Sequence, residues 1–239
     1  MRIALIGAGK MSRAVASLAP DRGHEITAMI ASAGNRGGEG LSRSSLGDPD
    51  VAIEFTTPSA ALPNVMACVQ YGIPVVVGTT GWYQHLPVAT SAANDRGGAF
   101  LWAPNFALGV NVFLEVVRRA AALLDVDGYF DAHVLETHHA AKKDAPSGTA
   151  KAIVQAAASD TWRDLPVTSV RLGNVPGTHE VIFDAPFEQV RLVHEARDRR
   201  VFADGALRAA EWLRGAWQTG RRGAFTMRDV LQLTEEFPK

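Results

Sequence analysis

The chain has 239 residues, 47% of them hydrophobic, enough to bury one large core or two modest ones. Its 24 Lys and Arg residues nearly balance 25 Asp and Glu residues, so a net charge of -1 argues against nucleic acid or an anionic membrane as a partner. No apolar run reaches the roughly 18 residues of a membrane span, and we expect a cytoplasmic protein. The single cysteine, Cys68, cannot form an intramolecular disulfide, and its apolar surroundings predict a buried thiol.

Apolar runs of strand length alternate with helical patterns over the first hundred residues. Val- and Ile-rich strands separated by helices are typical of a parallel sheet covered on both faces. We therefore predict an α/β fold that starts with a Rossmann-like, doubly wound parallel sheet. The predicted strands are Ile3–Ile6, Ile26–Ile30, Val51–Phe55, Pro74–Val77 and Phe100–Ala103, and the predicted helices are Met11–Leu18, Ala60–Gln70 and Ala89–Asp95.

The pattern changes after Asn105. A long helical period precedes several strand-like runs with short connections, which indicates a mixed sheet and a second, α+β domain. A last helix has its apolar residues at helical spacing, and periodicity alone does not assign it to either domain. The predicted helices are Val112–Leu124 and Ala206–Trp217, and the predicted strands are Ala132–Thr137, Ser169–Leu172, Glu180–Asp184 and Gln189–His194.

A glycine-rich turn joins the first predicted strand to the first helix. In a G-x-G-x-x-G turn at this place, backbone N–H groups and the helix N-terminus face a pyrophosphate. Here Ser12 replaces the third glycine, and serine is still small enough for close packing of helix on strand. A tight turn without a ligand is the alternative. The candidate cofactor-binding residues are Gly7, Ala8, Gly9, Lys10, Met11 and Ser12.

The end of the second strand bears on the choice of cofactor. NAD sites usually carry a carboxylate there for the ribose 2′-hydroxyl, and this chain has Ala31 and Ser32 instead. Together with Asn35 and Arg36, Ser32 would tolerate a 2′-phosphate, so we expect NADPH and/or NADH. The segment 31–45 is rich in Gly and Ser and predicts a flexible loop, which we expect to become ordered when the cofactor binds.

Two further loops follow predicted strands of the same sheet. Gly78, Thr79 and Thr80 come after one strand, and the segment Ala103, Pro104, Asn105 and Phe106 comes after the next. In open α/β sheets, ligands bind beyond the carboxyl ends of the strands, where both loops should lie. We interpret them as contacts to the nicotinamide half of the cofactor, with ordinary strand-terminating turns as the alternative.

The stretch 133–150, HVLETHHAAKKDAPSGTA, contains two adjacent histidines and two adjacent lysines. Side chains alternate along a strand, so His138 and His139 reach one pocket only if the strand ends beside them. His133 and the pair could instead bind zinc, but adjacent histidines suit one metal poorly, and we predict no metal. Lys142 and its neighbour could also be solvated surface charge.

The residues that follow have the pattern of a helix start. Ser147, Gly148 and Thr149 offer a capping hydroxyl, free N–H groups and the positive end of a helix dipole, which attract an anion. Two imidazoles, Lys142 and this helix N-terminus would form a cage for carboxylates that contains a proton donor. Such a site suits a small dicarboxylate that receives a hydride and a proton.

The segment 136–150, ETHHAAKKDAPSGTA, resembles the signature of the dihydrodipicolinate reductase family. Other blocks resemble the family in the same order, so the resemblance covers nearly the whole chain. They are EFTTP (54–58), GTTG (78–81), APNF (103–106), GVN (109–111), FADGA (202–206) and MRDVL (227–231).

The resemblance implies reduction of 4-hydroxy-tetrahydrodipicolinate, a cyclic dicarboxylate, in the diaminopimelate route to lysine. It implies that His138 is the acid/base residue and Lys142 the proton-donating lysine, and that His139, Lys142, Gly148 and Thr149 hold the substrate carboxylates. It also implies a homotetramer assembled through the second domain's sheet. The C-terminal segment would return to the first domain, giving residues 1–106 with 205–239 as one domain and 107–204 as the other.

Two other functions fit the same residues. One is a different two-domain NAD(P)-dependent dehydrogenase, which would act on an amino acid instead of a cyclic imine. The other is a dinucleotide sensor without turnover, in which Lys142 would have no role. A sensor that controls DNA would want a basic face and a recognition helix, and the near-neutral charge argues against one.

Overall fold

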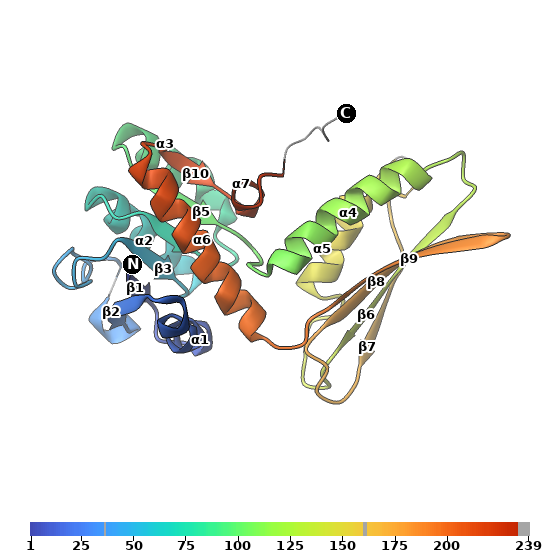
Figure 1. The fold of residues 1–239 in the computed structure, drawn as a ribbon, viewed down its shortest axis with the longest axis horizontal. Coiled ribbons are helices and arrows are strands. Elements are labelled where there is room, and N and C mark those ends of the chain that lie inside the picture. The colour runs from blue at the N-terminus through green and yellow to red at the C-terminus, as the bar shows by residue number, and fades with distance from the viewer. Residues whose placement is uncertain (36, 160–161, 234–239) are drawn as a thin grey trace. The chain divides into compact units, whose positions relative to one another are not determined.

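The computed structural model describes residues 1–35, 37–159 and 162–233. They form two compact units: Met1–Leu108 together with the chain from Arg200 onward, and Gly109–Arg199 (Figure 1). The first unit thus includes residues 107–108 and 200–204, which the sequence analysis assigns to the second domain. Among the described residues, no helix is long and apolar enough to cross a membrane.

The first unit contains a six-stranded sheet in the order β10-β5-β4-β3-β1-β2, and every neighbouring pair is parallel. This topology confirms the predicted doubly wound fold. The short strand β10 was not predicted, because three residues are too few to show a period. The strands are β1 (Arg2–Ile6), β2 (Glu25–Ile30), β3 (Val51–Glu54), β4 (Val75–Val77), β5 (Ala99–Trp102) and β10 (Gly223–Phe225).

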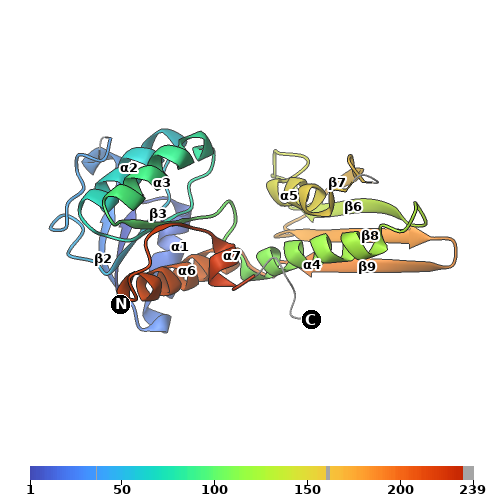
Figure 2. The ribbon, with the colours of Figure 1, turned by 90° about the horizontal axis from the view of Figure 1, so that it is seen from above.

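Helices cover both faces of this sheet (Figures 1 and 2). Alternate strand residues face opposite sides, so Leu5 packs with α1 and α6 in one core while Ile6 packs with α2 and α3 in the other. Cys68 is fully buried in the second core, and burial raises the pKa of its thiol to about 12. This agrees with a cysteine that serves in packing. The helices are α1 (Lys10–Leu18), α2 (Pro58–Gln70), α3 (Leu86–Asp95), α6 (Arg200–Gln218) and α7 (Met227–Val230), with 3-10 turns at Pro20–Arg22, Ser32–Gly34 and Tyr83–His85.

Helix α6 belongs to the first unit. Leu207 and Leu213 are fully buried in the core that contains α1. Arg22 forms ion pairs with Asp204 at 3.0 Å and with Glu211 at 2.7 Å, which join α6 to the turn after α1. The helix starts six residues before the predicted one, because Asp204 and Gly205 interrupt the apolar pattern between its first turn and the rest.

The second unit is a four-stranded mixed sheet with two helices, in agreement with the predicted α+β domain. The strand order is β7-β6-β8-β9, with β6 and β7 parallel and the other pairs antiparallel. Helices α4 and α5 pack on one face around Phe113, Val134, Ile153 and Phe183. The elements are α4 (Leu108–Leu124), β6 (Asp131–His138), α5 (Gly148–Ala157), β7 (Val167–Arg171), β8 (Thr178–Ala185) and β9 (Glu188–Glu195).

The opposite face of this sheet, the free face, carries the alternate residues of the same strands. Leu135 and Ile182 lie there, together with Val170 and Val193, which are 36% and 57% exposed. Phe187, at the tip of the hairpin between β8 and β9, is 93% exposed. Exposed valines on this face and an exposed phenylalanine at the hairpin tip are typical of an interaction surface.

Candidate active site

The glycine-rich turn after β1 brings the backbone close to its neighbouring strands. Gly7 has φ +106°, and a Cβ atom there would lie 2.0 Å from the carbonyl oxygen of Phe55. Its N–H donates to the Ile30 carbonyl at 2.8 Å. Only glycine fits this position, because any side chain would push the turn away from the end of β3.

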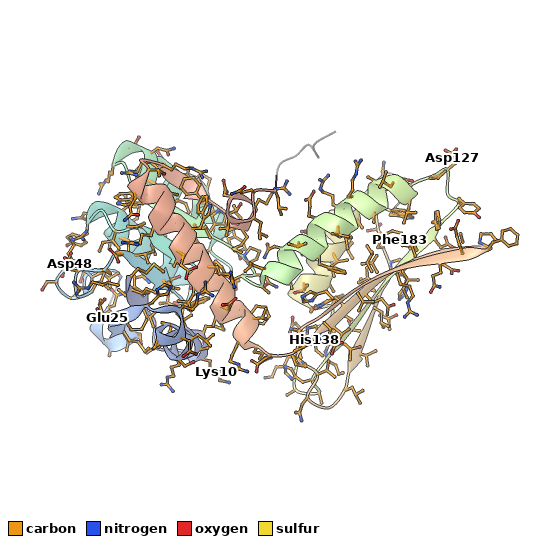
Figure 3. The ribbon with its side chains drawn as sticks, viewed as in Figure 1. Lys10, Glu25, Asp48, Asp127, His138 and Phe183 are labelled. Carbon is orange, nitrogen blue, oxygen red and sulfur yellow. The ribbon has the colours of Figure 1, made fainter. Side chains whose placement is uncertain are left out.

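The N-terminus of α1 is open to an anion. Gly9 is its N-cap residue, no side chain caps the helix, and a Cβ at Gly9 would meet no atom within 4 Å. Lys10, labelled in Figure 3, and Met11 begin the helix, and its first turn carries no acidic residue. Free N–H groups, a positive helix end and open space suit the pyrophosphate of a dinucleotide. Ser12 is fully buried, as its small size allows.

The two other predicted cofactor loops follow β4 and β5 in the same unit. A Cβ atom at Gly78 would lie 1.9 Å from the Phe55 ring, so the loop after β4 needs glycine there. Thr79 is 6% exposed, and its Oγ1 accepts a hydrogen bond from the Thr56 N–H at 2.7 Å. Thr80, by contrast, is exposed.

In the loop after β5, Ala103 and Phe106 are buried, Pro104 is exposed, and Asn105 accepts a hydrogen bond from the Ala107 N–H at 2.8 Å. Phe106 packs edge-on against Phe55, with ring centroids 6.1 Å apart. The loops after β1, β3, β4 and β5 are therefore joined on the carboxyl edge of the sheet, as the prediction required.

The loop after β2 is more firmly packed than its composition suggests. Ser32 begins a 3-10 turn, and Leu41 is 2% exposed within the core. Asn35 donates from its amide to the side chain of Asn64 at 2.7 Å, so that amide is used within the protein. Arg36, the other candidate for a 2′-phosphate, lies outside the described residues. The expectation of a flexible loop, made from composition, did not include these contacts. Ordering of the loop when the cofactor binds stays a prediction.

In the second unit, His138 is the last residue of β6 and only 7% exposed (Figure 3). Its Nδ1 lies 2.6 Å from an oxygen of Glu136, which is fully buried two residues earlier on the same face. The other Glu136 oxygen accepts from Arg171 at 2.8 Å and from the Ser147 N–H at 3.2 Å. Burial alone would raise the pKa of Glu136, but hydrogen bonds from Ser169, Arg171 and Ser147 outweigh it and hold that pKa at about 2.

This arrangement orients the imidazole of His138. An ionised Glu136 accepts the proton on Nδ1, which leaves Nε2 as the atom available to a substrate. A Cβ atom at Gly177 would lie 3.0 Å from Nε2, so glycine keeps that side of the ring accessible. Burial lowers the pKa of His138, Glu136 opposes the shift, and the charges of Lys142 and Arg171 lower it further.

A third histidine, His179 on β8, lies beside His138 with ring centroids 5.0 Å apart. Its Nε2 is 3.2 Å from the Ser147 hydroxyl, which caps α5 by accepting from the Ala150 N–H at 3.1 Å. Burial and the neighbouring His138 lower the pKa of His179 to about 4, so its ring is neutral at pH 7. The predicted helix start at 147–149 is thus confirmed, and Ser147 connects it to the histidines.

Glu136, His138 and His179 are also the residues, within the described parts of the chain, whose ligand atoms could surround a metal ion. Arg171 already donates to Glu136, and its positive charge disfavours a divalent cation there. The set fits proton handling better than metal binding.

The chain leaves the sheet after His138, and the segment that follows carries His139, Lys142 and Lys143. His139 Nε2 lies 2.7 Å from the guanidinium of Arg199, a residue that the sequence analysis did not single out. Lys142 donates to both carboxylate oxygens of Asp144, at 2.7 and 2.9 Å. Gly148 and Thr149 form the first turn of α5. These groups, with Arg171, surround the helix N-terminus with positive charge, which suits a ligand with two carboxylates.

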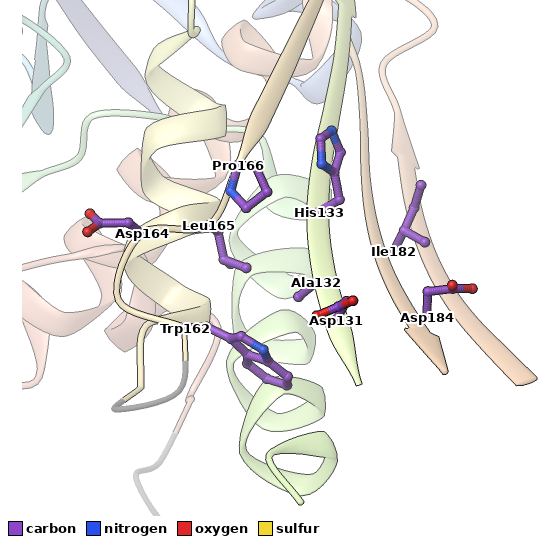
Figure 4. A pocket seen from close by; sticks show the side chains of 9 residues that line it. All are labelled: Asp131, Ala132, His133, Trp162, Asp164, Leu165, Pro166, Ile182 and Asp184. Carbon is purple, nitrogen blue, oxygen red and sulfur yellow. The ribbon is translucent and has the colours of Figure 1, made fainter. Parts of the chain in front are cut away.

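A separate cavity of about 420 Å³ lies at the other end of β6 (Figure 4). It is lined by His133 and Trp162, and by the carboxylates of Asp131, Asp164 and Asp184. Three carboxylates would repel a dicarboxylate, so this cavity is not the substrate site. His133 faces away from His138, since odd and even residues of β6 point to opposite sides of the sheet, and its ring bonds Thr168 at 2.9 Å.

A Rossmann-like unit with an open pyrophosphate turn, together with a unit that holds an acid/base imidazole beside basic side chains, is the composition of a two-domain NAD(P)H-dependent oxidoreductase. Family models of dihydrodipicolinate reductase match the chain at residues 1–106 for the N-terminal part and 109–231 for the C-terminal part. The chain belongs to the dihydrodipicolinate reductase family.

Similar proteins agree with this assignment. The chain is 34% identical over 245 residues to the 4-hydroxy-tetrahydrodipicolinate reductase of Christiangramia forsetii, covering 97% of this chain and 98% of that protein. It is 39% identical over 212 residues to the protein of the same name from Roseobacter denitrificans, covering 80% and 75%.

Solved structures share the fold. A dipicolinate-bound dihydrodipicolinate reductase from Paenisporosarcina sp. TG-14 has a TM-score of 0.74 at 23% identity, over 95% of this chain and 97% of that chain. The DAP dehydrogenase of C. glutamicum in complex with DAP has a TM-score of 0.57 at 14% identity, over 99% and 96%. The DAP dehydrogenase is an example of the same architecture with a different activity, so the architecture alone does not select the substrate.

Proposed function

We propose that this protein reduces 4-hydroxy-tetrahydrodipicolinate to tetrahydrodipicolinate with NADPH or NADH, in lysine and diaminopimelate biosynthesis. The observation that carries the proposal is the site at the end of β6, where His138 is held by Glu136 beside Lys142, Arg199 and the N-terminus of α5. A ring with two carboxylates that accepts a proton needs these groups together.

When bound, the reduced nicotinamide supplies the hydride. The residues of the chain supply binding and the proton, which passes from the Lys142 and His138 pair to the substrate while the 4-hydroxyl leaves as water, so that substrate, NAD(P)H and one proton give tetrahydrodipicolinate, NAD(P)⁺ and water. His138 presents Nε2, because Glu136 holds Nδ1. Lys142 retains one N–H beyond the two that it gives to Asp144, and this N–H is free to serve the substrate. His139, Gly148 and Thr149 bind the carboxylates, and Ser147 keeps the helix N-terminus in place.

Binding of dipicolinate tests the substrate site without turnover. We expect wild-type protein to bind dipicolinate in calorimetry, and His139→Ala and Arg199→Ala to weaken binding by about 10-fold or more, since each removes a partner of a carboxylate. Arg197→Ala is the matched control, because Arg197 is exposed two residues from Arg199. Equal affinity in Arg199→Ala and Arg197→Ala would contradict the placement of the substrate.

Two other activities compete with this proposal. One is a dehydrogenase acting on an amino acid, since the DAP dehydrogenase shares the fold. Such an enzyme would oxidise its amino acid with NADP⁺ and ignore the cyclic substrate. A dinucleotide sensor would bind the cofactor and be indifferent to changes at Lys142.

We also propose that the enzyme is a cytoplasmic homotetramer assembled through the free face of the second unit's sheet. Val170 and Val193 on that face, and Phe187 at the hairpin tip, are exposed apolar residues that a second copy would cover. In a two-fold symmetric interface the same patch of each copy contacts the other, so one sheet face serves both partners.

Light scattering after size exclusion tests the assembly. Val193→Asp places a carboxylate opposite Glu180 on the free face, and we expect it to shift the molar mass from four chains to fewer. Val88→Asp on α3 makes the same substitution at an exposed valine of the first unit and should leave the mass unchanged. A wild-type protein with the mass of one chain would refute the tetramer.

A further inference from the structure

Glu54 is a buried carboxyl that no step of the proposed reaction uses. It is the last residue of β3 and fully buried. One of its oxygens accepts from the Thr56 hydroxyl and from the Asn64 amide, the latter at 3.3 Å. Hydrogen bonds from the side chain and backbone of Thr79 also reach this carboxyl. A fully buried carboxyl is costly to desolvate, so its presence indicates a purpose that an apolar residue would not serve.

The first connection of Glu54 runs through α2 to the loop after β2. Asn64, which is fully buried on α2, donates to Glu54 and accepts from the Asn35 amide at 2.7 Å. The carboxyl is therefore the end of a chain of side-chain hydrogen bonds that holds the loop expected to receive the adenosine end of the cofactor.

The second connection runs to the loops after β3 and β4. Thr56, whose hydroxyl donates to Glu54, also donates its N–H to the Thr79 hydroxyl at 2.7 Å. The backbone carbonyl of Glu54 accepts from the Gly78 N–H at 2.8 Å. The loop after β4 is one of the two candidate contacts to the nicotinamide half. One residue thus joins segments that serve the two ends of the dinucleotide.

We propose that Glu54 and Asn64 are positioning residues that preset the loops after β2, β3 and β4 for the reduced nicotinamide dinucleotide. They touch the loops and not the cofactor, and their effect is to reduce the ordering that binding would otherwise require. Burial raises the pKa of Glu54, and the hydrogen bonds from Thr56, Thr79 and Asn64 oppose that shift. The inference rests on the proposed cofactor surface and is independent of the substrate's identity.

The test compares Glu54→Leu with Glu54→Gln. Glutamine keeps an oxygen that accepts from Thr56 and Asn64, whereas leucine keeps only the bulk. Measured by fluorescence titration of NADPH and NADH without substrate, Glu54→Leu should raise Kd by about 10-fold, and Glu54→Gln by less than about 3-fold. At saturating cofactor, kcat of Glu54→Leu should stay within about 3-fold of wild type, because chemistry is not affected.

Ser91→Ala, which removes an exposed hydrogen bond on α3, is the control and should bind the cofactor as wild type does. Thermal unfolding checks that each variant is folded. If Glu54→Leu does not fold, Asn35→Ala decides the question, because it breaks the same chain of hydrogen bonds at a partly buried loop residue and should raise the Kd for NADH, which has no 2′-phosphate for Asn35 to contact, by about 3- to 10-fold.

The inference would be overturned if the folded Glu54→Leu variant had the Kd values of the wild type. If Glu54→Leu does not fold, a wild-type Kd in Asn35→Ala would overturn it. Equal damage in Glu54→Gln and Glu54→Leu would overturn it as well. Because the cofactor is titrated alone, wild-type protein that binds NADPH but does not reduce the cyclic substrate would refute the proposed reaction and leave this inference standing.

Discussion

Replacing His138 by Gln should lower kcat by about 10²- to 10⁴-fold, the usual contribution of a positioned acid/base group. Glutamine can still donate to Glu136, so the buried carboxylate keeps a partner and the unit stays folded. The Kd for NADPH should remain within about 2-fold of wild type, since the candidate cofactor residues lie in the other unit. Rates at saturating substrate give kcat, and fluorescence titration gives the Kd for NADPH.

The matched control is His85→Gln, which makes the same substitution on a short turn outside both groups of candidate site residues. It should leave kcat and the Kd for NADPH unchanged. Turnover of His138→Gln within about 3-fold of wild type would remove His138 from the proton transfer and leave Lys142 as its donor.

Replacing Lys142 by Ala should lower kcat and also raise KM for the cyclic substrate, with a combined loss in kcat/KM of about 10³-fold. Both effects are expected because the ammonium group lies among the cations at the end of β6 and keeps one N–H to donate. Lys142→Arg separates the two roles. Arginine retains the charge but does not release a proton, so KM should stay near the wild-type value while kcat falls.

Lys143→Ala controls for a general loss of positive charge, because Lys143 is the exposed neighbour of Lys142. Its kinetics should match those of the wild type. Unchanged turnover in Lys142→Ala would show that the lysine has no part in the chemistry, and would favour a sensor if cofactor binding persisted.

The fold of the first unit was predictable because each strand and helix has a complete apolar period. The exceptions have physical causes. Strand β10, Gly223–Phe225, is too short for a period and forms only because β5 offers it an edge. Helix α6 starts at Arg200, before Asp204 and Gly205 break its apolar pattern, and its place is fixed by ion pairs such as Arg22–Asp204, which join residues far apart in the sequence.

The candidate substrate site was predictable only where its residues are contiguous. His138, His139, Lys142 and Ser147 lie in one segment, and their residue types together indicate proton transfer and anion binding. Glu136 precedes His138 by two residues, so the alternation of a strand could have placed both side chains on one face.

Three partners of that segment come from elsewhere in the chain. Strand register sets His179 of β8 opposite Glu136, and Arg171 of β7 opposite His138. Arg199 meets His139 only after the chain returns from β9. The hydrophobic periodicity of a single strand does not encode such pairings, which depend on how the strands are ordered in the sheet.

A coupled assay tests the central claim most directly. The cyclic substrate is generated from pyruvate and aspartate semialdehyde by its synthase, the protein is added, and oxidation of NADPH and of NADH is followed at about 340 nm. We predict oxidation that depends on the cyclic substrate and is abolished in Lys142→Ala. Absence of oxidation with either cofactor, in a protein that binds the dinucleotide, would contradict the account and favour a sensor or an amino-acid dehydrogenase.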